Sequence, residues 1–243
     1  MSAVWNPWHG CVKYSEGCAH CYVYRRDAQF GRDSSVPQRT ADFDLPLRRA
    51  RAGGWKIPSG EHVYACMTSD FFLDQADPWR DAAWDMMRLR PDLAFSVITK
   101  RVLRIKECLP ADWGEGWSHV EFGATIENQR RAEERMDEFL SVPVHGRFVI
   151  CEPMLGPVDL SPWLDPDRIR MVVAGGESGP GARCLNYDWV LALRDQCAAA
   201  SVAFHFKQTG ANFVKDGKLY RIERYLQIPQ ARRAGIDLPP RSR

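Results

Sequence analysis

The sequence contains no long hydrophobic run and no N-terminal segment in which basic residues precede an apolar stretch. A membrane-spanning helix needs about 20 mostly apolar residues, and a secretion signal needs a basic segment before an apolar core. Their absence predicts a cytosolic protein. Apolar residues make up 45% and charged residues 26% of the 243, as in an ordinary globular protein of one large domain or two small ones.

The sequence also lacks the glycine patterns of the common nucleotide-binding loops. Its glycine-rich turn, VVAGGESGPGAR at 172–183, matches neither G-x-G-x-x-G nor the P-loop. Two interpretations of these glycines stay open. They fit a tight turn that needs positive φ, and they equally fit a loop that brings backbone N–H groups close to an anion.

Short apolar runs alternate with helical patterns along the chain. The runs start about 23 to 32 residues apart, which fits one strand and one helix per repeat, and they are continuously apolar, as in a parallel sheet covered by helices. They are 62–68, 94–100, 119–126, 147–153, 170–177 and 202–208, with a short first strand at AVW. We therefore predict an α/β fold with a partial or closed (βα) barrel rather than a doubly wound sheet. The expected helices are PWRDAAWDMMRLR, RVLRIKECL, NQRRAEERMDEFL and YDWVLALRDQCAAA.

Polar and charged residues follow nearly every apolar run at its C-terminal edge. Parallel βα folds place their sites at this edge, because loops and helix N-termini converge there. Six such strand ends favour a site along one rim, although a single one is usually a helix cap, as Asn128 would be. The residues are Thr68, Ser69, Asp70, Thr99, Lys100, Arg101, Thr125, Glu127, Asn128, Glu152, Glu177, Ser178, Lys207 and Gln208.

Three of the eight cysteines are clustered near the N-terminus, at Cys11, Cys18 and Cys21, with the spacing C-x6-C-x2-C. In a cytosolic chain such a cluster is typical of a metal or redox site, whereas scattered cysteines usually behave as small buried apolar residues. The scattered ones are Cys66, Cys108, Cys151, Cys184 and Cys197.

The C-x2-C pair suits two thiolates on one metal ion or cluster. No second C-x2-C pair follows, so a zinc ribbon is not supported. A Cys3His zinc site that uses His9 or His20 stays an alternative. Three thiolates on a four-iron cluster would instead leave one iron open for a ligand, and the barrel rim beside it favours this interpretation.

Basic residues are concentrated in two stretches, 25–56 and the tail from Lys215. Both stretches also contain aromatic residues, at Phe30, Phe43 and Trp55 in the first and at Tyr220 and Tyr225 in the second. Such stretches suit a nucleic acid or nucleotide, and they equally fit a solvated surface with an unstructured tail. Within the tail, a hairpin is expected around Asp216-Gly217, followed by a loosely ordered basic end.

Several of these segments together resemble a phage- and bacterium-associated family without an assigned function, which itself resembles the radical S-adenosylmethionine (SAM) superfamily. The segments are WNPWHGC, SEGCAHCY, ACMTSDFF, FSVITKR, VEFGATIEN, RFVICEPMLGPVDL, VVAGGESGPGAR and FHFKQTG. The resemblance covers about residues 4–214. It implies a radical SAM-like barrel over 1–211 with an N-terminal iron–sulfur loop, and a C-terminal hairpin and basic tail over 212–243.

The resemblance further implies a [4Fe–4S] cluster on Cys11, Cys18 and Cys21, with SAM on the open iron. One electron, from a donor such as flavodoxin or ferredoxin, would cleave SAM to a 5′-deoxyadenosyl radical that abstracts hydrogen from a substrate. Two features depart from the superfamily: its usual spacing is C-x3-C-x2-C, and the strand before the cysteines is unusually short here.

Carried over position by position, the resemblance assigns residues to each part of SAM. His20 would lie near the adenine, Tyr22 would also contact the cofactor, and Thr68, Ser69 and Asp70 would lie near the methionyl amino group. Lys100 or Arg101 would pair with the methionyl carboxylate, and Glu127 and Asn128 with the ribose hydroxyls. Gly175, Gly176 and Glu177 would contact SAM or substrate. Glu152, Lys207 and Gln208 are left as candidate catalytic residues for the substrate.

Several of these residues also have a purely structural interpretation. Asp70 would cap a helix, Glu127 would pair with Arg130 or Arg131, and Lys207 would be solvated.

Three functions are therefore carried forward. The first is a radical SAM enzyme acting on a nucleotide or a modified base in DNA, bound through residues 25–56, in a bacterial or phage-infected cell. The second is a non-catalytic nucleic-acid-binding protein ordered by zinc or a cluster. The third is a hydrolase using Glu127, Glu152 and Glu177, which lacks a recognisable nucleophile–base pair.

Overall fold

The computed structural model describes residues 2–240, and the chain divides into two compact units. Unit 1 consists of Met1–Tyr14, Val23–Gly123 and Val142–Gly146. Unit 2 consists of Ser15–Tyr22, Ala124–Ser141 and Arg147–Arg243.

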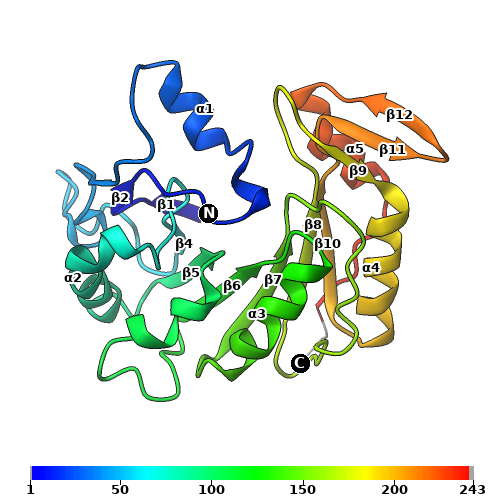
Figure 1. The fold of residues 1–243 in the computed structure, drawn as a ribbon. Coiled ribbons are helices and arrows are strands. Elements are labelled where there is room, and N and C mark those ends of the chain that lie inside the picture. The colour runs from blue at the N-terminus through cyan, green and yellow to red at the C-terminus, as the bar shows by residue number, and fades with distance from the viewer. Residues whose placement is uncertain (1, 241–243) are drawn as a thin grey trace. The chain divides into compact units, whose positions relative to one another are not determined.

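All seven predicted strands are present, each within a few residues of its predicted position (Figure 1). They are β1 (Ser2–Trp5), β4 (His62–Ala65), β5 (Ala94–Thr99), β6 (Val120–Thr125), β7 (Gly146–Cys151), β8 (Met171–Gly175) and β10 (Ala203–Gln208). Their hydrogen-bonded order is β1-β4-β5-β6-β7-β8-β10, and the pairs β1–β4, β4–β5, β7–β8 and β8–β10 are parallel. The α/β class and the parallel sheet are confirmed. The order has two ends, β1 and β10, which is compatible with a partial barrel.

Unit 1 is built on β1, β4 and β5, whose apolar residues face a dense aromatic core. Val63 and Phe95, which are register partners, are both fully buried, as is Trp84 of α2 (Asp77–Arg88). The Trp84 ring lies 4.7 Å from that of Phe71 and 5.3 Å from that of Trp113. The smaller elements of the unit are β2 (Trp8–His9), α1 (Tyr22–Ala28, which starts in unit 2), β3 (Gln38–Arg39), η2 (Leu45–Leu47) and η3 (Asp74–Ala76).

The helix predicted over RVLRIKECL is wrong. Two short 3₁₀ helices, η4 (Val102–Arg104) and η5 (Lys106–Cys108), take its place. Pro110 follows the segment, and a residue before proline is forced out of the helical region; Leu109 is accordingly extended, with φ −73° and ψ 144°. The helical conformation therefore ends at Cys108.

Unit 2 is built on β7, β8 and β10 with α3 (Gln129–Ser141) and α4 (Tyr187–Ala199). Both helices were predicted, and each buries an apolar stripe: Met136 and Phe139 on α3, and Val190 and Leu193 on α4. Asn186 caps α4, because its side chain accepts a hydrogen bond of 2.9 Å from the Asp188 N–H.

A second, three-stranded sheet in unit 2 has the order β12-β11-β9, formed by β9 (Cys184–Asn186), β11 (Asn212–Lys215) and β12 (Lys218–Arg221). The predicted hairpin around Asp216-Gly217 is confirmed: β11 and β12 are antiparallel, and the two turn residues have φ of 51° and 70°. Positive φ at both central residues is the geometry of a tight type I′ hairpin turn.

The prediction of a loosely ordered end after the hairpin is wrong over the described residues. The segment forms η6 (Arg224–Leu226) and α5 (Gln227–Arg233), and it buries Gln227 and Ala231. Leu238 then pairs with Phe204 of β10 through two backbone hydrogen bonds of 3.0 and 2.9 Å. These contacts hold the segment in place despite its charge. Residues 241–243 of the predicted tail lie outside the described residues.

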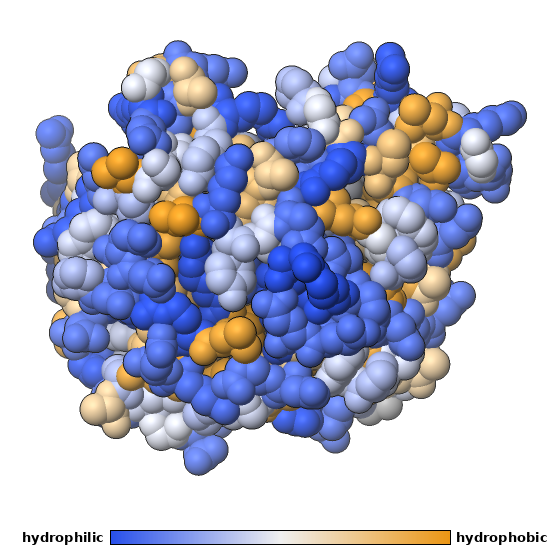
Figure 2. Space-filling view, viewed as in Figure 1, coloured by the Kyte–Doolittle hydropathy of each residue, from blue (hydrophilic) through white to orange (hydrophobic). Residues whose placement is uncertain are grey.

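The face of the molecule drawn in Figure 2 is mostly hydrophilic, with hydrophobic residues in small separate groups. Within residues 2–240, none of the helices combines the length and the apolar character that crossing a membrane requires.

Replacing Trp84 with Ala is expected to lower the free energy of unfolding by about 3–5 kcal/mol, because the change leaves a large cavity in the aromatic core of unit 1. Urea denaturation measures the effect. The matched control is Leu89→Ala, just beyond the end of α2, where the side chain is 63% exposed and the expected change is within about 0.5 kcal/mol. Equal losses in the two variants would contradict the assigned core.

Candidate functional site

The polar residues predicted to follow the strands do lie at the C-terminal ends of those strands in each unit. In unit 1 these are Thr68–Asp70 after β4 and Thr99–Arg101 at the end of β5. In unit 2 they are Glu127 and Asn128 after β6, Glu152 after β7, Gly175–Glu177 at the end of β8, and Lys207 and Gln208 at the end of β10. Parallel neighbours bring these ends to one edge within each unit.

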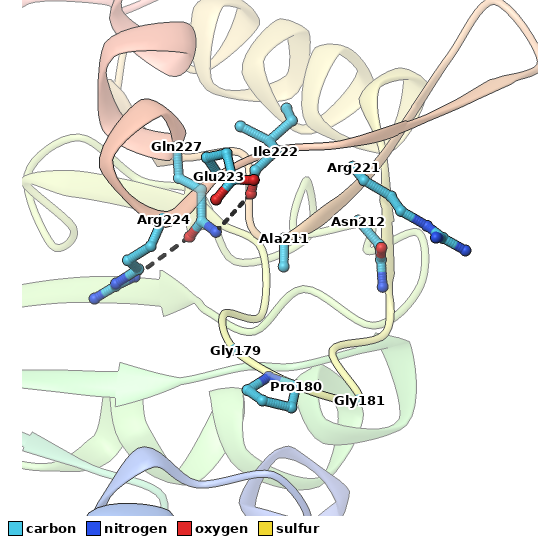
Figure 3. Close-up of a pocket in the computed structure, with 10 residues that line it drawn as sticks. All are labelled: Gly179, Pro180, Gly181, Ala211, Asn212, Arg221, Ile222, Glu223, Arg224 and Gln227. Atoms are coloured by element: carbon cyan, nitrogen blue, oxygen red, sulfur yellow. Dashed lines mark hydrogen bonds between the residues drawn. The ribbon is translucent and has the colours of Figure 1, made fainter.

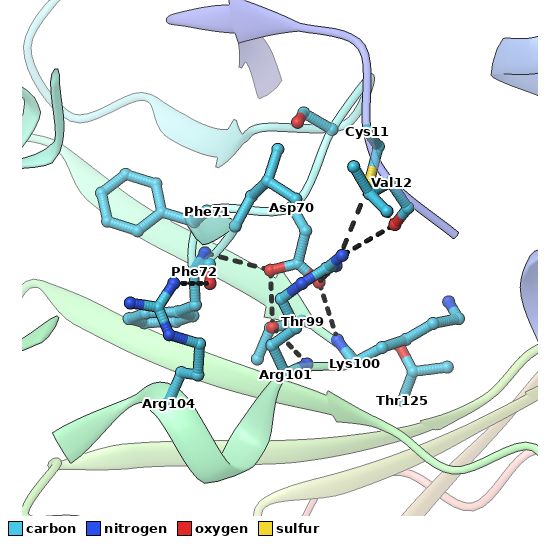
Figure 4. A network of polar contacts seen from close by, with 12 residues as sticks. Cys11, Val12, Asp70, Phe71, Phe72, Thr99, Lys100, Arg101, Arg104 and Thr125 are labelled. Carbon is cyan, nitrogen blue, oxygen red and sulfur yellow. Dashed lines mark hydrogen bonds and ion pairs between the residues drawn. The ribbon is translucent and has the colours of Figure 1, made fainter. Parts of the chain in front are cut away.

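Asp70 is the centre of the unit 1 network (Figure 4). One oxygen of its buried carboxylate accepts hydrogen bonds from Thr99 Oγ1 at 2.7 Å and from the Phe72 N–H at 3.0 Å. The other accepts from the Lys100 N–H at 3.0 Å and lies 3.4 Å from the Arg101 guanidinium. Four donors from the protein thus surround this carboxylate, so Asp70 joins the ends of β4 and β5 rather than capping a helix.

Arg101 connects this network to the first cysteine. It is 5% exposed, and its Nη2 donates to the Val12 carbonyl at 2.7 Å. Its Nη1 lies 3.8 Å from Cys11 Sγ. A guanidinium in this place fixes the backbone after Cys11, and it would favour a thiolate on the sulfur over a thiol.

The remaining predicted residues of unit 1 differ in what they contact. Ser69 Oγ donates to the Gly10 carbonyl and so holds the chain just before Cys11. Thr68 Oγ1 is buried and has no hydrogen-bond partner among the described residues. The Lys100 ammonium likewise makes no ion pair with any described residue. Of the two predicted cations, Arg101 is therefore engaged within the protein, and Lys100 is available.

In unit 2, the segment Ser15–Tyr22 carries Cys18 and Cys21, and we call it the cysteine loop. It contains η1 (Glu16–Cys18), and the Cys21 N–H donates to the Cys18 carbonyl at 3.3 Å. The two cysteines therefore lie one tight turn apart. Both are partly exposed and neither is in a disulfide.

Glu16 fastens the loop to the start of α3. Its carboxylate accepts hydrogen bonds from Asn128 Nδ2, from Arg131 at 2.6 Å and from Arg130 at 3.1 Å. Burial acts to raise the pKa of Glu16, but the hydrogen bonds from Arg131 and Asn128 lower it to about 2. Asn128 also accepts from the Arg131 N–H at 3.1 Å, so the predicted helix-cap role is confirmed.

Glu127 lies directly beneath the loop and is fully buried. It pairs with Arg135 at 2.7 Å, so the expected pairing with Arg130 or Arg131 is wrong; those arginines bind Glu16 instead. Ser15 Oγ donates to the other oxygen of Glu127. Gly17 packs so closely that a Cβ there would lie 2.5 Å from Glu127 Oε1, so any other residue forces Glu127 or the loop to shift.

Glu177, which follows β8, holds the other end of the loop. It is 7% exposed, accepts a hydrogen bond from Arg183 Nη2 at 2.6 Å, and lies 2.9 Å from His20 Nδ1. Arg183 in turn donates to the Glu16 carbonyl at 3.0 Å. Burial acts to raise the pKa of Glu177, but hydrogen bonds from Arg183 and His20 lower it to about 2.

The glycines before Glu177 allow two backbone segments to touch. A Cβ on Gly176 would lie 2.3 Å from the Thr209 carbonyl oxygen, and one on Gly175 would lie 3.0 Å from Glu152. The Gly176 N–H donates to the Gln208 carbonyl at 3.0 Å. These two glycines therefore serve close packing between the ends of β7, β8 and β10.

Among the three candidate catalytic residues, Lys207 and Gln208 both contact Glu152. Lys207 Nζ lies 2.7 Å from Glu152 Oε2, and Gln208 Nε2 lies 2.5 Å from Glu152 Oε1. Lys207 is therefore ion-paired, although its side chain is half exposed. Arg224 donates to Gln208 Oε1 at 3.1 Å. Tyr22, predicted to contact the cofactor, is 47% exposed at the start of α1.

The five scattered cysteines differ in exposure from the three N-terminal ones, which are partly exposed. Cys66, Cys108, Cys151 and Cys197 are buried as predicted, and burial raises the pKa of each thiol, to about 12 at Cys197. Cys184 is exposed, so the prediction of burial is wrong there. It lies in β9 of the small sheet rather than in an apolar strand.

The donor set of Cys11, Cys18 and Cys21 fits an iron–sulfur cluster chemically, because none of the three is in a disulfide and all three are partly exposed. Cys11 belongs to unit 1, and Cys18 and Cys21 belong to unit 2. Over residues 2–240, no three His, Cys, Asp or Glu side chains are gathered as a metal-binding group.

The basic residues of 25–56 are partly used inside unit 1. Arg48 binds Asp42 and Asp44, Arg39 stacks on Phe43 at 3.8 Å, and Arg49 stacks on Trp55 at 3.5 Å. Arg39, Arg48 and Arg49 therefore already interact within unit 1, although the sequence made them candidates for binding nucleic acid. Arg32 and Arg51 are exposed.

Four residues of the site are absent from the sequence-based assignment: Glu16, Arg183, Arg135 and Arg224. Arg183 ends the GGESGPGAR segment, and Glu16 lies between two of the clustered cysteines. These positions within recognised motifs could have indicated that both residues belong to the site. Arg135 and Arg224 lie on helical segments whose charges look like ordinary surface residues.

The Glu177 network predicts a defined pH dependence of stability. The pKa of Glu177 is lower in the folded than in the unfolded chain, so its contribution is present above about pH 4.5 and is lost as the pH falls toward 2. Glu177→Gln is expected to lower the unfolding free energy at pH 7 by on the order of 3 kcal/mol. The difference from the wild type should shrink as the pH approaches 2.

Urea denaturation at pH 7, 5 and 3 checks this, with the exposed Glu115→Gln as the control. A difference between wild type and Glu177→Gln that stays constant with pH would contradict the network.

Comparison with known proteins places the chain in a family. A family model described as "Protein of unknown function (DUF5131)" matches residues 1–234. None of the curated proteins and none of the solved structures matches the chain. The expected membership of a family without an assigned function is thereby confirmed, and the chain belongs to the DUF5131 family.

Proposed function

We propose that this protein is a radical SAM enzyme that carries a [4Fe–4S] cluster on Cys11, Cys18 and Cys21. The main support is the cysteine loop: two free, partly exposed thiols lie one turn apart on a segment that three carboxylates hold at the ends of β6 and β8. When bound, the cluster supplies the electron that cleaves SAM and so starts hydrogen abstraction from a substrate.

The protein's own residues fix the cysteines and leave them accessible. Asp70 and Arg101 hold the backbone around Cys11, and Glu16, Glu127 and Glu177 hold the loop with Cys18 and Cys21. These carboxylates are satisfied within the protein, so we assign them positioning roles instead of direct contacts with SAM. This changes the roles first expected for Asp70 and Glu127.

Lys100 is the best candidate to bind the methionyl carboxylate, because its ammonium makes no ion pair with any described residue and lies at the end of β5 beside the Asp70 network. Thr68, with its unpartnered buried hydroxyl, adds a polar contact in the same unit. His20 can present its outer ring atoms to the adenine while Nδ1 stays on Glu177.

The Glu152–Lys207–Gln208 group is the candidate substrate contact in unit 2. It offers a carboxylate, an ammonium and an amide within one hydrogen-bonded group, which can orient a polar substrate and hold or release a proton at Glu152. The substrate we propose is a nucleotide or a base in DNA, and the electron donor a flavodoxin or ferredoxin.

A second candidate function is a nucleic-acid-binding protein in which the metal only orders the N-terminal segments. The exposed basic residues after β11 favour it. It predicts bound zinc, and no cleavage of SAM.

The cysteine assignment predicts iron binding that depends on Cys18. Protein purified without oxygen and reconstituted with iron and sulfide should bind about four irons per chain and form 5′-deoxyadenosine with SAM and dithionite. Cys18→Ala should lose both.

Cys184→Ala is the matched control, because Cys184 is also free and exposed but lies outside the cluster. It should keep its iron. Stoichiometric zinc without SAM cleavage would replace the proposal with the second candidate.

The contact beneath the loop predicts a second effect on iron. Gly17→Ala forces a Cβ against the Glu127 carboxylate, so the loop must shift and the iron content after reconstitution should fall by more than half. Gly156→Ala is the control, since a Cβ there meets only Asn128 Cβ at an ordinary 3.9 Å. Unchanged iron in Gly17→Ala would show that the loop position does not matter for the cluster.

A further inference from the structure

The hairpin strand β12 exposes apolar and basic side chains together. All four of its residues, Lys218 to Arg221, are exposed; Leu219 is 52% and Tyr220 46% exposed. Tyr225, in η6, is 74% exposed. β12 is also the edge of its three-stranded sheet. Large exposed side chains of this kind, next to cations, are typical of a binding surface.

The charge of this region is positive and largely uncompensated. Residues 212–240 contain six Lys or Arg and three Asp or Glu. Of the acids, Asp237 is already bound to His205. Lys218 and Arg221 form no ion pair with any described residue, whereas Arg48 of the basic stretch in unit 1 is paired twice. Lys218 and Arg221 are therefore available to bind a polyanion.

A cavity of about 330 Å³ lies beside the hairpin in unit 2 (Figure 3). The turn Gly179–Gly181 forms one wall, and Asn212, Arg221, Glu223 and Arg224 contribute polar side chains. Arg224 contacts only neutral amide oxygens there, on Gln208 and Gln227, so its charge is not neutralised by them. The volume is at the lower end of the range for ligand sites, which suits one nucleotide unit.

The cavity adjoins the candidate substrate contacts. Arg224 bonds Gln208, which in turn bonds Glu152, and the Ala211 N–H donates to the Glu177 carbonyl at 2.8 Å. A chain held on the hairpin would therefore pass next to the rim residues of unit 2.

We propose that β12, η6 and this cavity bind single-stranded nucleic acid. Lys218, Arg221 and Arg224 contact phosphates, and Tyr220 and Tyr225 stack on bases. Glu223 offers an acceptor to a base amino group. This inference rests on the proposed function only in naming the substrate class, and it places the nucleic acid on the hairpin instead of residues 25–56.

The test measures binding of the full-length protein to a fluorescein-labelled 12-nucleotide single-stranded DNA by fluorescence anisotropy between 50 and 200 mM salt. Removing two phosphate contacts in Lys218→Gln/Arg221→Gln should weaken binding at 50 mM salt about 10- to 100-fold and reduce the salt slope by about 1.4. Tyr225→Ala should weaken it at least about 5-fold. The Tyr225 side chain is largely exposed, so this variant leaves the core intact.

Arg32→Gln/Arg51→Gln is the matched control, because it removes the same charge from exposed positions in unit 1. It should change binding less than about 2-fold. Equal loss in the two double variants, equally tight binding of the duplex, displacement by polyglutamate at equal charge, or no binding by the wild type would each overturn the proposal.

Iron content and 5′-deoxyadenosine formation, measured separately on the wild type, distinguish the two proposals. DNA binding without SAM cleavage refutes the radical SAM function alone. SAM cleavage without DNA binding refutes the hairpin surface alone.

Discussion

The ion pair between Glu127 and Arg135 is the contact on which the architecture of the unit 2 site depends. Both side chains are fully buried, and a buried charge without its partner costs several kcal/mol. Arg135 also donates to the Thr125 carbonyl at 2.6 Å, at the end of β6. The pair therefore ties α3 to the end of β6 and leaves one Glu127 oxygen for Ser15, at the start of the cysteine loop.

The same arrangement occurs in both units. A carboxylate that follows a strand pairs with an arginine, and the carboxylate or its arginine contacts a segment next to a cysteine. Glu177 does this with Arg183 and His20, and Asp70 does it with Arg101, whose guanidinium reaches Val12 and Cys11. Short loops have few apolar contacts to hold them, so charge-assisted hydrogen bonds fix their position. The cysteines themselves remain accessible.

The strands could be predicted from the sequence because a buried parallel strand is a continuous apolar run. The polar residues at the C-terminal ends of the strands could be predicted because they directly follow these runs. The prediction of a helix over RVLRIKECL was wrong, because Pro110 ends the helical conformation there. The prediction of a loosely ordered basic end was wrong because Leu238 pairs with β10 through its backbone. Backbone hydrogen bonds of a charged segment cannot be predicted from its residue pattern, because they do not depend on side-chain type. Membership of the family was recognisable from the order of the motifs.

By itself the sequence determined the α/β class, the strand order along the chain, the hairpin at Asp216-Gly217, and which residues follow the strands. Local patterns encode these features. Only the tertiary structure decided which carboxylates are engaged and that Arg131 binds Glu16 and not Glu127. It also decided that Lys218 and Arg221 make no ion pair with a described residue, whereas Arg48 is paired. Each of these depends on distances between residues far apart in the chain, which spacing along the sequence does not contain.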